Sequence, residues 1–178
     1  MELFKIKHRF TKEVLFQKKC ESFKECVEAA CACDINLSCS DLSCCALYYS
    51  NFIVTNFTEC DFRYSNFKYV NFALCNFTDC NLTGCDFSWC NFNHSIFKDT
   101  IITDAGDVIN KIPTQITGFK WPVTIFEHHM KIGCEIHRIS DWKAFDDKRI
   151  NEMNLGALDF WKKNKQFLLS ACAANGRT

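Results

Sequence analysis

The sequence predicts an all-β solenoid core with mixed α and β structure at both ends. Large apolar residues recur at every fifth position from Leu37 to Ile102. The residue before each of them is usually Asn or Asp, and the residue two before is usually Ser, Thr or Cys. A period of five matches neither a helix, with about 3.6 residues per turn, nor a strand, with about 2. It matches a chain that turns once per unit, and such units must stack to bury their apolar side chains.

The repeated units also carry a recognisable pattern. Residues 50–94 read SNFIV TNFTE CDFRY SNFKY VNFAL CNFTD CNLTG CDFSW CNFNH. This stretch resembles the pentapeptide-repeat family, whose consensus is A-(D/N)-L-x-x. The resemblance implies a right-handed quadrilateral β-helix with four pentapeptides in each coil. It implies little about function, because one fold hosts many functions.

The N-terminal segment, residues 1–33, is expected to cap the first coil with a hairpin and a helix. Residues 4–10 alternate in hydrophobicity as a strand does, and residues 14–16 are the expected partner strand. Ser22 and Glu25 stand at the spacing of a capping box, which predicts the start of a helix. The apolar face of that helix would consist of Phe23, Cys26, Val27, Ala30 and Cys31.

The pentapeptide-repeat β-helix is expected over residues 34–103, and residues 104–178 form a C-terminal cap or dimerisation region with α+β structure. In that last segment, residues 118–137 suggest two short strands around Pro122 and Gly133. Ser140 and Asp146 are expected to begin short helical turns. Residues 156–173 predict an amphipathic helix that packs on the last coil or joins two copies in a homodimer. Its apolar residues are Leu158, Trp161, Phe167 and Leu168.

The same C-terminal region resembles phage and prophage proteins that carry pentapeptide repeats. The resemblance rests on GFKWPVTI, on HMKIGCEIH and on a helix with the pattern F-W-x-x-x-K. The N-terminal stretches HRFTKEVLF and VEAA add to it. This likeness implies a phage-encoded protein but brings no activity with it.

Composition narrows the class of protein. The 21 basic and 21 acidic residues cancel, so no bulk charge favours direct binding of nucleic acid. The 14 cysteines would suggest a disulfide scaffold in a short secreted chain. However, the N-terminus MELFKIKHRFTKEVLF has no apolar signal region, and no apolar run reaches the roughly 20 residues of a membrane helix. We therefore expect a cytoplasmic protein with mostly reduced thiols and no membrane contact.

Four cysteines, Cys75, Cys80, Cys85 and Cys90, follow one another at intervals of five residues. They occupy the small-residue position of the repeat, where Ser and Thr stand in other units. The favoured interpretation is that they are small buried residues. Two alternatives stay open: a disulfide between stacked cysteines such as Cys60 and Cys80, and a metal ion held by several sulfurs.

A second group of metal-ligand residue types lies in the C-terminal region. His128, His129, Cys134 and His137 include enough ligands for a zinc ion with one open position. Glu135 would then act as a general base. The spacing matches no established metalloenzyme motif, so the alternative is a cap in which these side chains pack and bond locally.

Outward-facing aromatic residues form a candidate binding surface. Counting by 20 residues places Tyr49, Tyr69 and Trp89 in one stripe, with Tyr64 on the neighbouring side. Exposed rings in a row are typical of a protein interface or of a stacking surface for a base. The alternative is that a ladder of like residues only stabilises the repeats, or that a terminal cap covers it.

These observations favour a non-catalytic binding protein that presents a rigid β-helix surface to a host protein or small ligand, with no cofactor. If the chain is phage-encoded, inhibition or sequestration of a host component is the natural role. Acidic residues outnumber basic ones in the repeats, and the topoisomerase-inhibiting members of the family are acidic rods thought to mimic DNA. A DNA mimic is therefore one alternative, and a metal-dependent activity in the C-terminal region is another.

Overall fold

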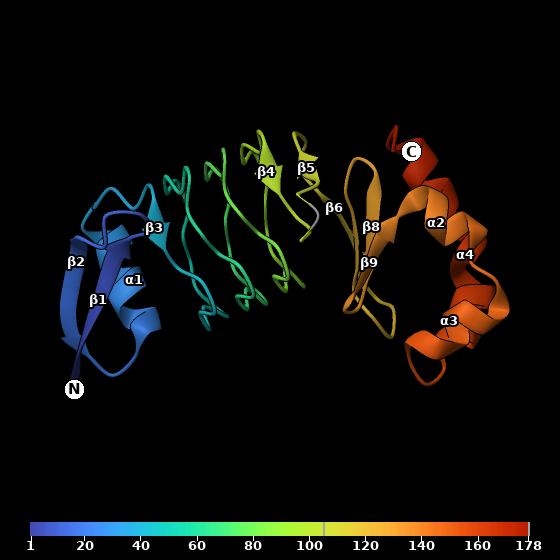
Figure 1. The fold of residues 1–178 in the computed structure, drawn as a ribbon, viewed down its shortest axis with the longest axis horizontal. Coiled ribbons are helices and arrows are strands. Elements are labelled where there is room, and N and C mark those ends of the chain that lie inside the picture. The colour runs from blue at the N-terminus through green and yellow to red at the C-terminus, as the bar shows by residue number, and fades with distance from the viewer. Residues whose placement is uncertain (105, 178) are drawn as a thin grey trace. The chain divides into compact units, whose positions relative to one another are not determined.

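The computed structural model describes residues 1–104 and 106–177. They form two compact units, Met1–Ile112 and Pro113–Thr178. The first unit contains the N-terminal elements and the repeats, and the second contains a small sheet with three helices (Figure 1). The structure thus mixes helices with several small sheets.

The chain begins with an antiparallel hairpin and a helix. Strand β1 (Glu2–His8) pairs with β2 (Val14–Cys20), and the register shifts between Ile6 and Lys7. The expected strand ends earlier than Phe10, which lies in the turn and is 65 % exposed. Helix α1 (Phe23–Ala32) follows, and the Ser22 side chain accepts a hydrogen bond from the Glu25 N–H, as expected for a capping residue. Its buried residues are Cys26, Val27 and Ala30.

The hairpin is joined to the start of the repeats. Strand β3 (Ser40–Asp41) pairs with the end of β1, so the sheet order is β2-β1-β3. The Arg9 N–H also donates to the carbonyl of Cys39. The N-terminal elements and the repeats therefore form one unit (Figure 1).

The repeats are held together by parallel pairing between residues 20 apart in sequence. The bridges run from Asp41–Asp61 to Asn81–Ile101. Each is a single residue long, because a turn follows every few residues and no strand can extend. At the end of the repeats, the two-residue strand β4 (Thr100–Ile101) pairs with β5 (Val108–Ile109) in antiparallel fashion. We call each 20-residue period a coil.

The large apolar residue of every unit is buried, as the repeat predicted. All fourteen positions from Leu37 to Ile102 are at most 5 % exposed. Rings stack on the equivalent rings of the next coil; Phe72 and Phe92, for example, lie 5.5 Å apart and almost parallel. Burial of each large side chain stabilises the fold by about 1.5–3 kcal/mol, so the repeats have a continuous core of their own.

The second unit is a four-stranded antiparallel sheet followed by three helices (Figure 1). The region expected to hold two strands contains three, because the chain turns both before His129 and at Gly133. Helix α2 (Ile139–Ala144) begins one residue earlier than expected, whereas Asp146 caps α3 (Asp147–Met153) as predicted. The strands are β6 (Thr114–Ile116), β7 (Val123–Ile125), β8 (His129–Ile132) and β9 (Glu135–Arg138), and the helices are α2 (Ile139–Ala144), α3 (Asp147–Met153) and α4 (Ala157–Ala174).

Helix α4 buries its apolar face within the second unit. Trp161 and Leu168 belong to a core that also contains Val123 and Ile125 of β7. These two side chains are thus buried by the second unit's own residues. Phe167, by contrast, is 54 % exposed and touches Phe119 edge to face.

Candidate interaction surface

A left-handed backbone conformation recurs at every fifth residue of the repeats. The second residue after each buried apolar residue from Leu37 to Phe97 has φ between about 51° and 69°. The N–H of the next residue then bonds back to the carbonyl of the apolar residue, as Ser65 does to Phe62 at 3.1 Å. This is the geometry of a type II turn. The residues at these corners are Cys39, Cys44, Tyr49, Val54, Glu59, Tyr64, Tyr69, Leu74, Asp79, Gly84, Trp89, His94 and Asp99.

The Asn and Asp residues of the repeat stabilise these corners. Their side-chain oxygens accept the N–H two residues later, as Asn76 does from Thr78 at 3.0 Å and Asp86 from Ser88 at 3.0 Å. This is the local hydrogen bonding that favours Asn and Asp in turns. The corners are thereby fixed, and the side chains that project from them stand on a rigid backbone.

The small residues of the repeat link successive coils. Most of their side chains donate to the carbonyl 23 residues earlier: Cys75 to Phe52 at 2.7 Å, for example, and Ser95 to Phe72 at 2.7 Å. Cys75, Cys80 and Cys85 are buried as expected and Cys90 is half-buried, but they also act as weak donors. Burial raises the pKa of Cys75 and Cys90 to about 12. The same contact is made by Cys60, Ser65, Cys80, Cys85, Cys90 and Thr100.

Three of the predicted aromatic residues form a stacked column at one corner. The rings of Tyr49 and Tyr69 lie 4.9 Å apart and 3° from parallel. The rings of Tyr69 and Trp89 lie 5.9 Å apart and 6° from parallel. All three are exposed, at 67 %, 47 % and 42 %. We call Tyr49, Tyr69 and Trp89 the aromatic column.

The next corner along the chain carries an aliphatic counterpart that the sequence pattern did not predict. Val54 and Leu74 occupy equivalent corners of two coils and are 68 % and 54 % exposed. Counting outward aliphatic residues at intervals of 20, in the same way as the rings, would have found them. Together with the aromatic column they give the repeats one side rich in exposed apolar atoms. This apolar face comprises Tyr48, Tyr49, Ile53, Val54, Tyr69, Leu74 and Trp89.

Tyr64 stands apart from the aromatic column. It occupies the preceding corner, where its ring lies against Gly84 of the next coil. Its hydroxyl donates to the Asp104 carboxylate at 2.9 Å, and this bond raises the pKa of Tyr64. Tyr64 therefore has a bonding role of its own and does not extend the stacked rings.

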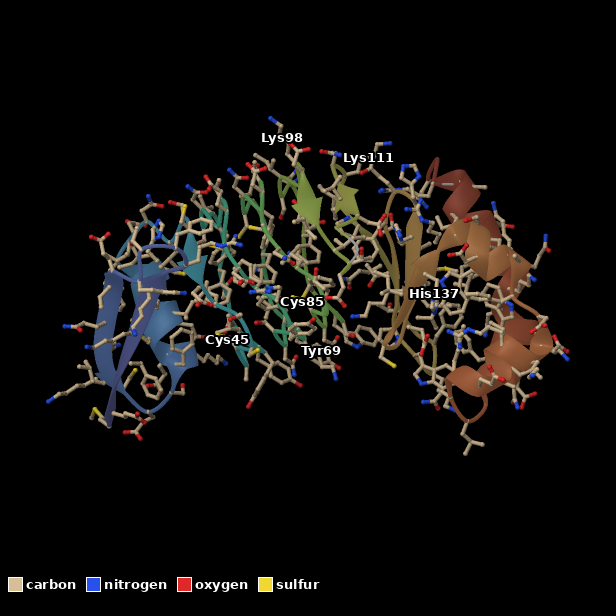
Figure 2. The ribbon with its side chains drawn as sticks, viewed as in Figure 1. Cys45, Tyr69, Cys85, Lys98, Lys111 and His137 are labelled. Atoms are coloured by element: carbon tan, nitrogen blue, oxygen red, sulfur yellow. The ribbon has the colours of Figure 1, made fainter. Side chains whose placement is uncertain are left out.

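A different corner carries carboxylates. Glu59, Asp79 and Asp99 occupy equivalent positions in successive coils and are exposed. We call them the acidic column. Figure 2 shows Tyr69 and Lys98, which neighbours Asp99, projecting from opposite edges of the repeats. The apolar face and the acidic column therefore offer two chemically distinct surfaces.

The predicted metal ligands of the second unit are not brought together. In residues 1–104 and 106–177, no three His, Cys, Asp or Glu side chains gather around a point where an ion would sit. His129 faces Arg138 across the sheet, whereas His137 faces Met130, so the two histidines point to opposite faces. His137 bonds to Glu135 at 2.8 Å, and Cys134 is exposed. His128 precedes β8 and completes no ligand set.

Across the part of the chain that the structure describes, no helix has the length and apolar content needed to cross a bilayer. The pentapeptide-repeat family model matches residues 40–79 and 71–105, with eight copies of the repeat. No curated protein matches the chain. This match agrees with the period of five and with the corner turns, which also indicate five-residue repeats. Residues 40–105 therefore consist of pentapeptide repeats.

Proposed function

We propose that this chain is a non-catalytic binding protein that presents the apolar face of a right-handed, four-sided β-helix to a partner protein. Parallel pairing at intervals of 20 residues supports the four-sided coil, and the family supports its handedness. The phage-like sequence layout supports a component of the host cytoplasm as the partner, which the chain would inhibit or sequester.

The apolar face carries this proposal. Its side chains are exposed, so a role in the core does not explain why they are apolar. Those at the corners are also of residue types that are unfavourable at positive φ. A residue other than Gly, Asn or Asp at positive φ costs roughly 1–2 kcal/mol, yet Tyr49, Val54, Tyr69 and Leu74 all stand there. Contiguous exposed apolar residues are a mark of interaction sites.

The stacking of the aromatic column favours a protein over a nucleobase. Rings whose centroids lie 4.9 and 5.9 Å apart leave no room for another ring between them, because stacked aromatic planes need about 3.5 Å on each side. The faces of Tyr69 are thus occupied by its neighbours. The column leaves its ring edges and hydroxyl groups accessible to a partner. These groups suit a protein surface, which has both polar and apolar groups.

Affinity capture from a host lysate tests the proposal. The wild-type chain should retain a partner that the double variant Tyr69→Ala/Trp89→Ala loses. The matched control is Thr58→Ala/Thr78→Ala, which changes a polar surface of the same repeats. Circular dichroism and the melting temperature should show that both variants stay folded. Equal capture by the wild type and the aromatic variant would make the column purely structural.

DNA mimicry is a second candidate, supported by the acidic column. Glu59, Asp79 and Asp99 repeat along one corner, as charges on a phosphate backbone do. Supercoiling by a host topoisomerase should then be inhibited by the wild-type chain and spared by Glu59→Gln/Asp79→Asn/Asp99→Asn. Unchanged supercoiling at a large excess of the wild-type chain would remove this candidate.

Homodimerisation through α4 is a further proposal. Phe167 is exposed on this helix and is available for contact with a second copy. Sedimentation of the wild type should give a dimer, and Phe167→Ser should give a monomer. A monomeric wild type at high concentration would contradict the proposal.

A further inference from the structure

The second unit contains an apolar cavity of about 60 Å³. It lies between the turn that joins β8 to β9 and the helices α2, α3 and α4. Three of the four tryptophans of the chain line it. Its aromatic walls are Trp121, Trp142, Phe160 and Trp161, and Cys134 and Asn154 stand at exposed positions around it.

The walls of the cavity are held in place by contacts of their own. Trp142 and Trp161 lie 5.2 Å apart, and Trp121 meets Phe160 edge to face at 5.1 Å. The Trp142 Nε1–H donates to the Met130 carbonyl at 2.7 Å. An apolar cavity with fixed walls can bind a small apolar molecule.

One lining residue has a polar group without a hydrogen-bond partner among the residues that the structure describes. Trp161 is 3 % exposed, and its Nε1–H is buried without a hydrogen-bond acceptor. Native proteins leave few buried donors unpaired, because a donor that is removed from water without an acceptor destabilises the folded state. The contrast with Trp142, whose N–H is paired, suggests that the acceptor for Trp161 comes from whatever fills the cavity.

Charges around the cavity disfavour a cation. Aromatic cages often hold quaternary ammonium groups. Here, however, the Lys120 ammonium already lies 4.2 Å from the centre of the Trp121 ring, and the Lys165 ammonium lies 5.4 Å from that of Trp161. The nearby carboxylate, Glu135, is bonded to His137. Among the described residues that line the cavity, Glu135 is the only carboxylate, so no second carboxylate remains to pair with a cation.

We propose that this cavity binds the uncharged end of a small molecule, a branched alkyl or compact aromatic group that carries one oxygen. That oxygen accepts the hydrogen bond of the Trp161 Nε1–H. A volume of about 60 Å³ accommodates roughly four to six water-sized spheres, which suits a tert-butyl group or part of a ring. The proposal concerns the second unit alone and is independent of the apolar face.

Neopentyl alcohol is a suitable probe because it joins a tert-butyl group to a single hydroxyl. The ¹⁵N-labelled full-length chain has four tryptophans, hence four indole N–H signals, which Trp→Phe variants assign. Titration should shift the Trp161 signal furthest, with saturation at a Kd of about 1 mM, as expected for so small a ligand. Neopentylamine has the same carbon skeleton but is protonated at neutral pH and cannot accept. It should bind at least about 5-fold more weakly.

A blocking variant locates the binding. Ala157 lines the cavity, and Ala157→Leu should fill it and abolish the shift of the Trp161 signal. Ala173→Leu makes the same change at an exposed position of the same helix and should leave the titration unaltered.

The wild-type titration is decisive even if the blocking variant does not fold. The proposal is overturned by the absence of a saturable shift, or by a shift of Trp89 with Trp161 unmoved. Equal or tighter binding of neopentylamine would show that the ligand need not be uncharged and need not accept a hydrogen bond from Trp161. Retained binding in a folded Ala157→Leu chain would overturn the location.

Discussion

The Sγ atom of Cys75 lies 2.7 Å from the carbonyl oxygen of Phe52, one coil away. The same oxygen also accepts the N–H of Thr55 within its own turn. Most such carbonyls thus accept one hydrogen bond from their own turn and one from the next coil. The high cysteine content therefore has a structural reason: a small side chain with a donor suits this position, and Ser and Thr meet the same need elsewhere.

Replacing Cys75 by serine or alanine tests this role. Cys75→Ser keeps a donor, so the free energy of unfolding should change by less than about 1 kcal/mol. Cys75→Ala loses both the donor and the sulfur volume and should cost about 1–2 kcal/mol. Urea unfolding measures both. If serine proves more harmful than alanine, the sulfur acts only by filling space.

Thiol reactivity should divide the cysteines by position. Cys33, Cys44 and Cys134 are exposed and should react rapidly with a disulfide reagent at pH 8. Cys75 and Cys90, whose pKa values burial raises to about 12, should react only as fast as the repeats open, because the thiolate is the nucleophile. Counting thiols before and after denaturation checks this. Rapid reaction of the buried thiols in the folded chain would contradict it.

Val54→Asn should stabilise the chain. Val54 has φ of 64°, a conformation that β-branched residues rarely adopt and that Asn tolerates. We expect the free energy of unfolding to rise by about 0.5–1 kcal/mol, while capture of the proposed partner weakens. Ile53→Asn is the matched control, because Ile53 is exposed but does not have positive φ. A gain of stability in both variants would show that the gain does not come from the positive φ of Val54.

Acid should weaken the repeats partly through Asp61. Burial opposes its ionisation, but hydrogen bonds from Arg63 outweigh this and lower the pKa of Asp61. A lowered pKa in the folded state means that this stabilisation is complete well above 3.8, the ordinary value, and is lost as the pH falls below it. Asp61→Asn keeps the turn bond to the Arg63 N–H and should flatten this part of the stability curve.

The cost of Asp61→Asn at neutral pH should be about 1 kcal/mol, since Arg63 is half exposed and water screens the pair. Chemical unfolding at pH 7 and at pH values below 3.8 provides the comparison. Identical pH dependence in the two chains would exclude Asp61 as a contributor.

Gly84→Ala should disturb Tyr64. Gly84 has φ of 69°, and an added Cβ would lie 2.7 Å from Cε1 of the Tyr64 ring. A Cβ at this positive φ should cost about 1–2 kcal/mol, and the ring must move, so that its bond to Asp104 should break. The tyrosine absorbance titration reports the change, because loss of that bond removes the cause of the raised pKa of Tyr64. An unaltered titration would show that the ring had not moved.

The sequence predicted the repeats well because each unit is local. Five residues contain their own turn, so Phe72 and Asn76 could be assigned to the interior and to a turn without knowledge of distant contacts. Counting by 20 likewise predicted that Tyr49, Tyr69 and Trp89 stack. The hydrogen bond from Cys75 was not predicted, because a small side chain suggests burial before it suggests a donor.

The second unit was harder to predict because its features depend on distant contacts. The helix near its end was expected from periodicity, but three strands appeared where two were expected. The cavity joins Trp121, Trp142 and Trp161, which lie on separate elements. No spacing rule brings them together. His129 and His137 were grouped as ligands from sequence proximity, whereas the alternation of side chains along paired strands separates them.

The 20-residue period of the bridges sets what changes of length the repeats can absorb. Loss or gain of five residues keeps every turn but rotates all later units by a quarter of a coil, which would move Trp89 out of line with Tyr69. Loss or gain of 20 residues restores the alignment. A duplicated coil would thus lengthen the aromatic and acidic columns together, so tandem duplication offers a simple route by which such a protein could change its reach while keeping the chemistry of each face.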